Sequence, residues 1–249
     1  MPELLYGRNA VREALRARRR QLHRLRVSSG VQETGVIAEI IRLAEQAAIP
    51  VERVERQALD RQLREANHQG VALETGPYPY VELDACLALA AERKEPALLL
   101  LIDHLQDPQN VGTLLRTAEV VGAHGVALPG RRAAEITPAV VNASAGATEH
   151  LQIVLVGNLV QTIAELQRNG VWVVGLEDDE VAQDLDRADL NMPLALVVGA
   201  EGAGLARLVR ERCDFLVRLP MAGQIASLNA AVAGSIALYH AWRQRARAD

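Results

Sequence analysis

The sequence has little cysteine and no long uninterrupted hydrophobic run. Two cysteines in 249 residues, Cys86 and Cys213, make neither a disulfide framework nor a metal site. No apolar segment approaches the roughly 20 residues of a membrane-spanning helix, and the N-terminus lacks the apolar core of a secretory signal peptide. Internal repeats and low-complexity tracts are also absent. We therefore expect a reduced, cytoplasmic protein without a membrane or metal partner.

Several familiar catalytic patterns are missing as well. The six histidines, His104 among them, are scattered, and no Ser-His-Asp or Cys-His set is credibly placed. The stretch GAEGAG at residues 199–204 has neither the Lys-Ser/Thr ending of a P-loop nor the spacing of a dinucleotide-binding fingerprint. Glu201 between the glycines would also repel phosphate. A nucleotide-dependent α/β enzyme is therefore an alternative that this stretch disfavours, and simple turn formation by the glycines is another.

The net charge of −4 hides an uneven distribution. Residues 1–80 hold 13 arginines and 10 acidic residues, whereas the remainder is acidic, and eight arginines fall within residues 8–26. The planar fork of arginine suits phosphate recognition, but a solvated helix face explains such a run equally well. Because the basic end belongs to an acidic whole, it favours a local contact with nucleic acid.

The spacing of apolar residues predicts alternating helices and strands. In the first part we expect helices at 8–19, 35–48 and 58–66, and strands at 22–27, 50–54 and 70–74. In the later part we expect helices at 83–92, 113–121, 138–144, 159–168, 205–212 and from 227, and strands at 97–102, 125–128, 151–155, 171–175, 195–198 and 215–219. The sequence GPYPY at 76–80 carries two prolines, which block both helix and central strand, and marks a boundary.

The stretch from residue 195 to 233 carries few polar side chains among many small and apolar ones. Its two predicted strands each end in a loop of small residues, and ligands in α/β folds collect beyond the carboxyl ends of strands. Ser227 has a second interpretation as the N-cap of the following helix. The polar residues that need an explanation are Glu201, Gln224, Ser227 and Asn229.

A second candidate pair, Asn110 and Arg116, lies upstream at a predicted junction between a loop and a helix. Asparagine can hold a substrate or a neighbouring loop, and arginine can grip a phosphate. Taken singly, each is more often structural, since asparagine caps helices and arginine decorates surfaces.

Together and in this order, three stretches resemble the motifs of the SpoU class of RNA ribose 2′-O-methyltransferases. They are DHLQDPQNVGTLLRTAEVVGA at 103–123, LVVGAEGAGL at 196–205 and LPMAGQIASLNAAVA at 219–233. In addition, GRNAVREAL at 7–15 and HQGVAL at 68–73 resemble the small ribosomal-protein-like substrate domain that precedes the catalytic domain in bacterial members.

This resemblance implies an α/β fold with two domains. The expected parts are an RNA substrate-binding α/β domain (1–76), a linker and connecting helix (77–95), and a parallel-sheet methyltransferase domain (96–249) whose C-terminal segment forms a trefoil knot. S-adenosylmethionine is the implied cofactor. The implied partner is a second copy, in a homodimer packed through the knotted domain, where the motif arginine often acts near the partner's cofactor.

The resemblance also assigns residues by motif position. Those expected to be catalytic are Arg116, Asn110, Glu201 and Asn229. Those expected to bind the cofactor are Gly199, Leu219, Met221, Ser227 and Leu228. Because an arginine side chain stays protonated in proteins, we expect Arg116 to orient phosphate or hydroxyl while the proton passes to phosphate or solvent.

The implied reaction is methyl transfer to a ribose 2′-hydroxyl of RNA. The N-terminal domain favours a guanosine of 23S ribosomal RNA as the target, with tRNA as the second choice. A non-catalytic RNA-binding member of the fold is the alternative from a different class. Such a member would be expected to lose Asn110, Arg116 or Glu201, and all three are present.

Overall fold

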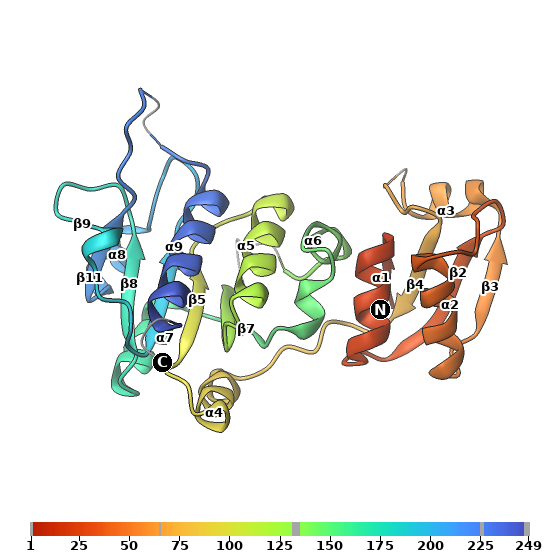
Figure 1. Ribbon diagram of the computed structural model, residues 1–249, viewed down its shortest axis with the longest axis horizontal. Helices are drawn as coiled ribbons and strands as arrows, with labels where there is room; N and C mark the ends of the chain where they lie inside the picture. Colours follow the sequence, from red (N-terminus) through yellow and green to blue (C-terminus); the bar gives the residue numbers. More distant parts are fainter. Residues whose placement is uncertain (1, 65, 131–134, 225–226, 247–249) are drawn as a thin grey trace. The chain divides into compact units, whose positions relative to one another are not determined.

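The computed structural model describes residues 2–64, 66–130, 135–224 and 227–246 (Figure 1). The chain forms two compact units, and each is described by itself. The first unit comprises Met1–Pro79 and Ile136–His150, and the second comprises Tyr80–Glu135 and Leu151–Asp249. Ile136–His150, which the sequence assigns to the methyltransferase domain, thus packs with the N-terminal unit.

The first unit is built on a four-stranded sheet in the order β1-β4-β2-β3. The β2/β3 pair is parallel and the other two pairs are antiparallel. Leu5, Leu15, Leu25 and Leu73 are fully buried in this unit. Its elements before the linker are β1 (Glu3–Tyr6), α1 (Arg8–Ala17), β2 (Leu22–Ser28), α2 (Val36–Gln46), β3 (Val51–Val54), α3 (Arg56–Gln62) and β4 (Val71–Thr75).

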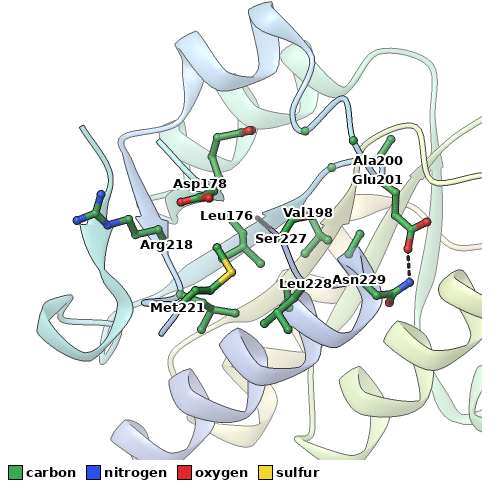
Figure 2. Close-up of a pocket in the computed structure, with 17 residues that line it drawn as sticks. Leu176, Asp178, Val198, Ala200, Glu201, Arg218, Met221, Ser227, Leu228 and Asn229 are labelled. Carbon is green, nitrogen blue, oxygen red and sulfur yellow. Dashed lines mark hydrogen bonds between the residues drawn. The ribbon is translucent and has the colours of Figure 1, made fainter. Parts of the chain in front are cut away.

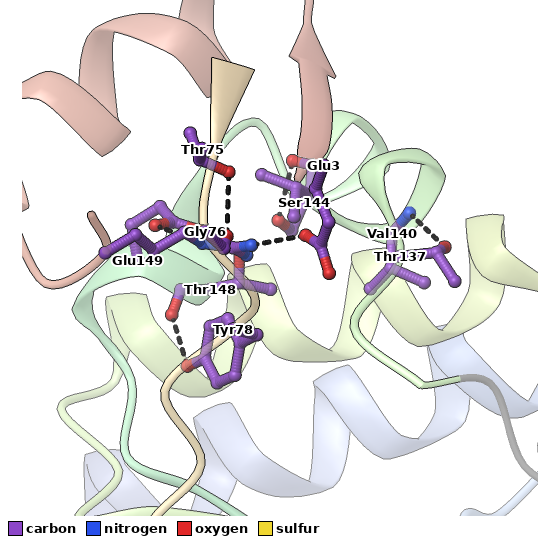
Figure 3. A network of polar contacts seen from close by, with 11 residues as sticks. Glu3, Thr75, Gly76, Tyr78, Thr137, Val140, Ser144, Thr148 and Glu149 are labelled. Atoms are coloured by element: carbon purple, nitrogen blue, oxygen red, sulfur yellow. Dashed lines mark hydrogen bonds and ion pairs between the residues drawn. The ribbon is translucent and has the colours of Figure 1, made fainter. Parts of the chain in front are cut away.

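The inserted segment of the first unit contains α6 (Pro138–Ala143) and the 3-10 helix η1 (Ala147–His150). Arg20, whose side chain has no exposed surface, donates from Nη2 to Oε1 of Glu149 at 2.9 Å and also pairs with Glu3. The hydroxyl of Tyr78 donates to the carbonyl of Thr148 at 2.8 Å (Figure 3), and burial raises the pKa of Tyr78. Buried polar contacts therefore tie this segment to β1 and to the linker.

The second unit contains a seven-stranded sheet in which all neighbours are parallel. Its order is β7-β6-β5-β10-β8-β11-β9, so β10, a late strand, lies between two earlier ones. The strands are β5 (Leu98–Ile102), β6 (Gly125–Pro129), β7 (Ile153–Val156), β8 (Trp172–Leu176), β9 (Gln183–Asp184), β10 (Leu194–Val198) and β11 (Phe215–Arg218). The expected α/β class with a parallel sheet is confirmed, and the threading of a knot stays a prediction.

Helices cover the sheet of the second unit. One cluster of buried apolar residues joins strand residues such as Leu99 and Val173 to Leu83, Ile163 and Val209 on three helices. These helices are α4 (Leu83–Arg93), α7 (Leu159–Arg168) and α8 (Arg207–Arg212), and a short 3-10 helix η2 spans Leu185–Arg187. The remaining helices, α5 (Pro108–Val120) and α9 (Ala230–Arg245), pack against each other. Within the described ranges, every helix is too short or too polar to cross a bilayer.

Close packing of α9 depends on Gly234. A Cβ atom at this position would lie 2.6 Å from Cδ2 of Leu114 on α5 and 2.9 Å from Cγ2 of Val198 on β10. A larger residue would force α9 away from both elements. At the other end of α9, the half-buried Arg245 guanidinium donates to the carbonyls of Pro96 at 2.6 Å and Ala97 at 3.0 Å. The C-terminal helix is therefore anchored at both ends.

Two helix starts, those of α5 and α9, differ most from the sequence-based expectation. Helix α5 begins at Pro108, five residues earlier than predicted, because Asp107 is its N-cap and accepts from the backbone N–H groups of Gln109 and Asn110. Asp-Pro therefore starts a helix here instead of forming a turn. The N-cap of α9 is Asn229, so the interpretation of Ser227 as the cap was wrong. Strands β1 and β9 were not predicted.

Candidate functional site

The carboxyl ends of four adjacent strands, β5, β10, β8 and β11, meet at one edge of the parallel sheet. A cavity of about 480 Å³ lies beyond β8, β10 and β11 and reaches the start of α9 (Figure 2), a size typical of small-molecule sites. Its wall combines backbone of the glycine loop with apolar and polar side chains. They come from Leu176, Glu177, Asp178, Val198, Gly199, Ala200, Glu201, Gly202, Gly204, Arg218, Leu219, Met221, Ser227, Leu228, Asn229, Ala230 and Ala233.

The glycine loop, residues 199–204, is a tight closed turn. Ala200 and Gly204 exchange two backbone hydrogen bonds of 3.1 and 3.0 Å, and Gly204 has a positive φ of 63°. A Cβ on Gly199 would lie 2.3 Å from the carbonyl oxygen of Gly204, so only glycine allows this approach. The loop therefore presents backbone to the cavity and carries Glu201 at its turn.

Three predicted catalytic residues, one from each motif, are hydrogen-bonded together. Asn110 Nδ2 on α5 donates to Glu201 Oε1 at 3.3 Å, and Asn229 Nδ2 donates to Asn110 Oδ1 at 3.0 Å. Asn229 Nδ2 also donates to Glu201 Oε1, as Figure 2 shows, while its Oδ1 caps α9 through the N–H of Ala231 at 3.0 Å. Residues far apart in sequence thus form one polar cluster at the rim of the cavity.

The structure does not bring Arg116, the fourth predicted catalytic residue, to the cavity of the same chain. Arg116 is exposed on α5, one turn before the exposed Val120. In the part of the chain that the structure describes, its guanidinium has no ion pair and no side-chain hydrogen bond. This arginine is therefore available to a molecule outside the chain.

All the residues predicted to bind the cofactor lie on the cavity wall: Gly199, Leu219, Met221, Ser227 and Leu228. Met221 and Leu228 are 40% and 43% exposed, which is unusual for large apolar side chains and fits a wall that a ligand covers. Ile225 and Ala226 of the third motif lie outside the described residues.

Sequence reasoning missed the part of the wall that follows β8 and ends β11. Leu176, Glu177 and Asp178 sit at the carboxyl end of β8, and Arg218 ends β11, where its Nε donates to Asp184 Oδ1 at 2.9 Å. Figure 2 shows Asp178 and Arg218 at the opposite end of the cavity from Glu201 and Asn229. The rule that ligands bind beyond strand ends could have indicated the residues after β8.

Other chemistries find little support in the described residues. Among them, no group of three or more histidine, cysteine or acidic side chains is placed to hold a metal ion. Cys86 is buried, and burial raises the pKa of the Cys213 thiol to about 12, which suppresses the reactive thiolate.

Comparison with known families shows to which family the chain belongs. A model of the SpoU rRNA Methylase family matches residues 97–239, which is more than half of the chain. The chain belongs to the SpoU rRNA methylase family. A second model, described as RNA 2′-O ribose methyltransferase substrate binding, matches residues 4–81. The chain is therefore an RNA methyltransferase, and S-adenosylmethionine is the cofactor of its family.

Relatives and solved structures agree with this SpoU family membership. A Bacillus subtilis (strain 168) protein named putative TrmH family tRNA/rRNA methyltransferase YacO is 43% identical over 243 residues, 98% of this chain and 96% of its own. The structure of the SpoU methyltransferase AviRb from Streptomyces viridochromogenes, in complex with AdoMet, is similar with a TM-score of 0.80 and 27% identity, covering 99% of this chain and 91% of AviRb. A putative TrmH family RNA methyltransferase from Porphyromonas gingivalis is similar with a TM-score of 0.77 and 27% identity, covering 98% and 90%.

Proposed function

We propose that this protein transfers the methyl group of S-adenosylmethionine to a ribose 2′-hydroxyl of RNA, at a guanosine of 23S ribosomal RNA. The observation that carries the proposal is the cluster of Asn110, Glu201 and Asn229, which joins all three motifs at the rim of one cavity. Family membership supports the reaction class. The nucleotide and the RNA are the finer part of the proposal.

The cavity fits S-adenosylmethionine in size and in chemistry. Leu219, Met221 and Leu228 offer an apolar wall. The glycine loop, whose closed shape a side chain at Gly199 would prevent, offers backbone donors and acceptors to an adenine ring. Carboxylates at Asp178 and Glu201 suit a cationic ligand and disfavour nucleotide phosphates. S-adenosylmethionine supplies an electrophilic methyl group on a sulfonium. The sulfur leaves as a neutral thioether, so this leaving group needs no acid.

The protein's own residues then have to align the ribose and assist the loss of the proton from its 2′-hydroxyl. Glu201 is held by two asparagine side chains, so its orientation is fixed before RNA arrives. Asn110 and Glu201 at the rim offer hydrogen-bonding groups to a ribose. We assign to Arg116 the orientation of the phosphate or hydroxyl next to the reacting group, with the proton passing to phosphate or solvent.

The proposal includes a homodimer in which Arg116 serves the cavity of the partner. Its support is the exposed apolar face of the paired helices α5 and α9, where Val120 is 67% exposed and Val232, Ile236 and Tyr239 are 43% to 49% exposed. Arg116 and Val120 are four residues apart and so share this helix face. An exposed apolar face of this kind typically marks a surface that a protein partner covers.

This arrangement can be tested with mixed dimers. An inactive Arg116→Ala subunit mixed with an inactive Gly199→Val subunit, which cannot hold the cofactor, should recover about a quarter of the wild-type activity at equal amounts, because half of the dimers pair one of each and restore one site. Activity that does not recover would show that Arg116 acts within its own chain or that the dimer is wrong.

The first unit is proposed to capture the RNA, and tRNA is kept as the second substrate because the Bacillus subtilis relative is named a tRNA/rRNA methyltransferase. The arginine run alone is weak support for RNA binding. Within the described residues, Arg12, Arg16, Arg20, Arg24 and Arg26 already form ion pairs with carboxylates. The substrate-binding family match over residues 4–81 is the stronger support.

The direct test is transfer of tritiated methyl groups from S-adenosylmethionine to purified ribosomal RNA and tRNA, followed by nucleoside analysis. Label in 2′-O-methylguanosine of 23S ribosomal RNA is the expected result. Label in tRNA would keep the reaction and replace the substrate. Label on a base instead of a ribose would overturn the proposed chemistry.

A further inference from the structure

Two carboxylates hold consecutive backbone N–H groups at the exit of the glycine loop. Glu177, which follows β8, accepts from the N–H of Leu205 at 2.8 Å. Asp103, which follows β5 and is almost fully buried, accepts from the N–H of Ala206 at 2.7 Å. Strands on both sides of β10 therefore each send one carboxylate to the loop that β10 carries.

Glu177 reaches the loop because Gly204 has no side chain. A Cβ on Gly204 would lie 2.2 Å from Oε1 and 2.7 Å from Oε2 of Glu177. Gly204 in turn closes the loop through its paired hydrogen bonds with Ala200. Its backbone also lies directly against Gly199, where it occupies the space of a Cβ atom. The position of the Glu177 carboxylate and the shape of the cavity wall are therefore coupled through Gly204.

We propose that Glu177 is a positioning residue for methyl transfer, which holds the glycine loop in the shape that receives the cofactor. This inference rests on the proposed function, because it takes the cavity to be the S-adenosylmethionine site. Glu177 acts through the loop and not on the reacting atoms. Its hydrogen-bond acceptor is what matters, so glutamine at this position retains the role, whereas alanine loses it.

A positioning role predicts an effect on cofactor affinity with little effect on the chemical step. Without the acceptor, the N–H of Leu205 loses a charge-assisted hydrogen bond and the free loop samples other shapes. Part of the binding free energy of the cofactor is then used to order the loop in the competent shape, which weakens binding. Once cofactor and RNA are bound, Asn110, Glu201 and Asn229 are unchanged, so the maximal rate is preserved.

The experiment compares the full chain with Glu177→Ala, Glu177→Gln and the control Glu180→Ala, which removes an exposed carboxylate three residues away that does not line the cavity. Calorimetry measures the dissociation constant of S-adenosylmethionine, and initial rates give kcat and the KM for the cofactor. We expect Glu177→Ala to raise both the dissociation constant and KM about tenfold, with kcat within about twofold of wild type. Glu177→Gln should restore the affinity to within about threefold, and Glu180→Ala should match wild type.

Unchanged affinity in Glu177→Ala would overturn the inference, as would a glutamine variant as weak as alanine, since that result would mean a direct charge contact with the ligand. If Glu177→Ala does not fold, Glu177→Asp takes its place, because the shorter side chain withdraws the carboxylate from Leu205. A wild-type chain that does not bind S-adenosylmethionine in the same titration would overturn the proposed function itself. The two failures are therefore distinguishable.

Discussion

The two units of the molecule use charged side chains differently. In the first unit, arginines pair with carboxylates at the surface, as Arg24 does with Glu52, and in the interior, where the Arg20 side chain is buried and pairs with Glu149 and Glu3. In the second unit, the carboxylates of Asp103 and Glu177 at strand ends accept from the backbone of the glycine loop, and Arg116 has no ion pair among the described residues. At Arg20 charge stabilises the fold of the first unit, whereas at Asp103 and Glu177 it shapes a loop of the candidate site in the second.

This difference shows that the number of charged residues in a segment says little about its function. The arginine-rich segment 8–26 is the most conspicuous feature of the composition, yet most of its charge is neutralised locally. The residues that form the candidate site come from an acidic, less conspicuous region. What distinguishes them is their place at the carboxyl edge of a parallel sheet, where backbone groups and side chains are left open to a ligand.

The largest expected effect comes from Arg116 of the second unit, which has no ion pair among the described residues. Arg116→Ala should lower methyl transfer by about a thousandfold or more, because losing an orienting charge in the transition state costs several kcal/mol. The dissociation constant of S-adenosylmethionine should stay within about threefold. Single-turnover rates and calorimetry measure the two quantities. As a control, Arg168→Ala changes an exposed arginine on α7 and should leave the rate unchanged; substantial turnover by Arg116→Ala would contradict the account.

The second effect concerns stability in the first unit. Arg20→Met should lower the free energy of unfolding by about 3 kcal/mol, because Glu149, which is only 1% exposed, would be left buried without its partner. Arg24→Met, in an exposed pair with Glu52, should cost less than about 1 kcal/mol. Urea denaturation of both variants checks the contrast. Equal losses would mean that the buried pair is no more important than a surface pair.

The third variant separates the two roles of Asn229. Asn229→Ala should lower stability by about 1 kcal/mol through loss of the α9 cap and should reduce kcat by about tenfold or more through loss of the bond to Glu201. Asn229→Ser keeps a capping oxygen but is too short to bridge Asn110 and Glu201. It should therefore recover stability and not activity. Recovery of both would reduce Asn229 to a helix cap.

The smallest effect contrasts Arg20, the buried arginine of the first unit, with His124, a buried histidine of the second unit. Nδ1 of His124 accepts from the N–H of Leu98 at 3.0 Å, and burial lowers the pKa of His124. Below the ordinary value near 6.5 the unfolded chain binds a proton more readily than the folded chain, so stability falls as the pH falls through that value. Thermal melts at pH 7.5 and 5.5 should show that the melting temperature falls between these pH values by about 2 °C less in His124→Gln than in the wild type. The same decrease in melting temperature in His124→Gln and in the wild type would exclude His124 as the source of the pH dependence.

Much of the fold follows from the sequence because apolar periodicity reports burial directly. The strands at 97–102 and 195–198 were predicted to within a residue, since each is an apolar run between clear breaks. The start of α5 was predicted five residues too late, because Asp107-Pro108 suits both a turn and a helix start. The grouping of Ile136–His150 with the first unit could not be foreseen, because it depends on contacts such as Arg20 with Glu149 across 129 residues.

The candidate site was predictable where a motif carried it and not elsewhere. All five expected cofactor residues lie on the cavity wall, and their binding role stays a prediction. Arg116 does not line the cavity of its own chain, and its expected action near the cofactor of the partner stays a prediction. Glu177 was missed because it stands in a polar stretch whose side chains have no distinctive spacing. Its contact with Leu205 arises only when β8 and β10 become neighbours.

The most direct test of the central claim is a calorimetric titration of the intact protein with S-adenosylmethionine, ATP and NAD. The account predicts one S-adenosylmethionine site per chain, no binding of ATP or NAD, and loss of binding in Gly199→Val, where the side chain would collide with Gly204. Binding of ATP alone, or S-adenosylmethionine binding that survives Gly199→Val unchanged, would contradict the assignment of the cavity.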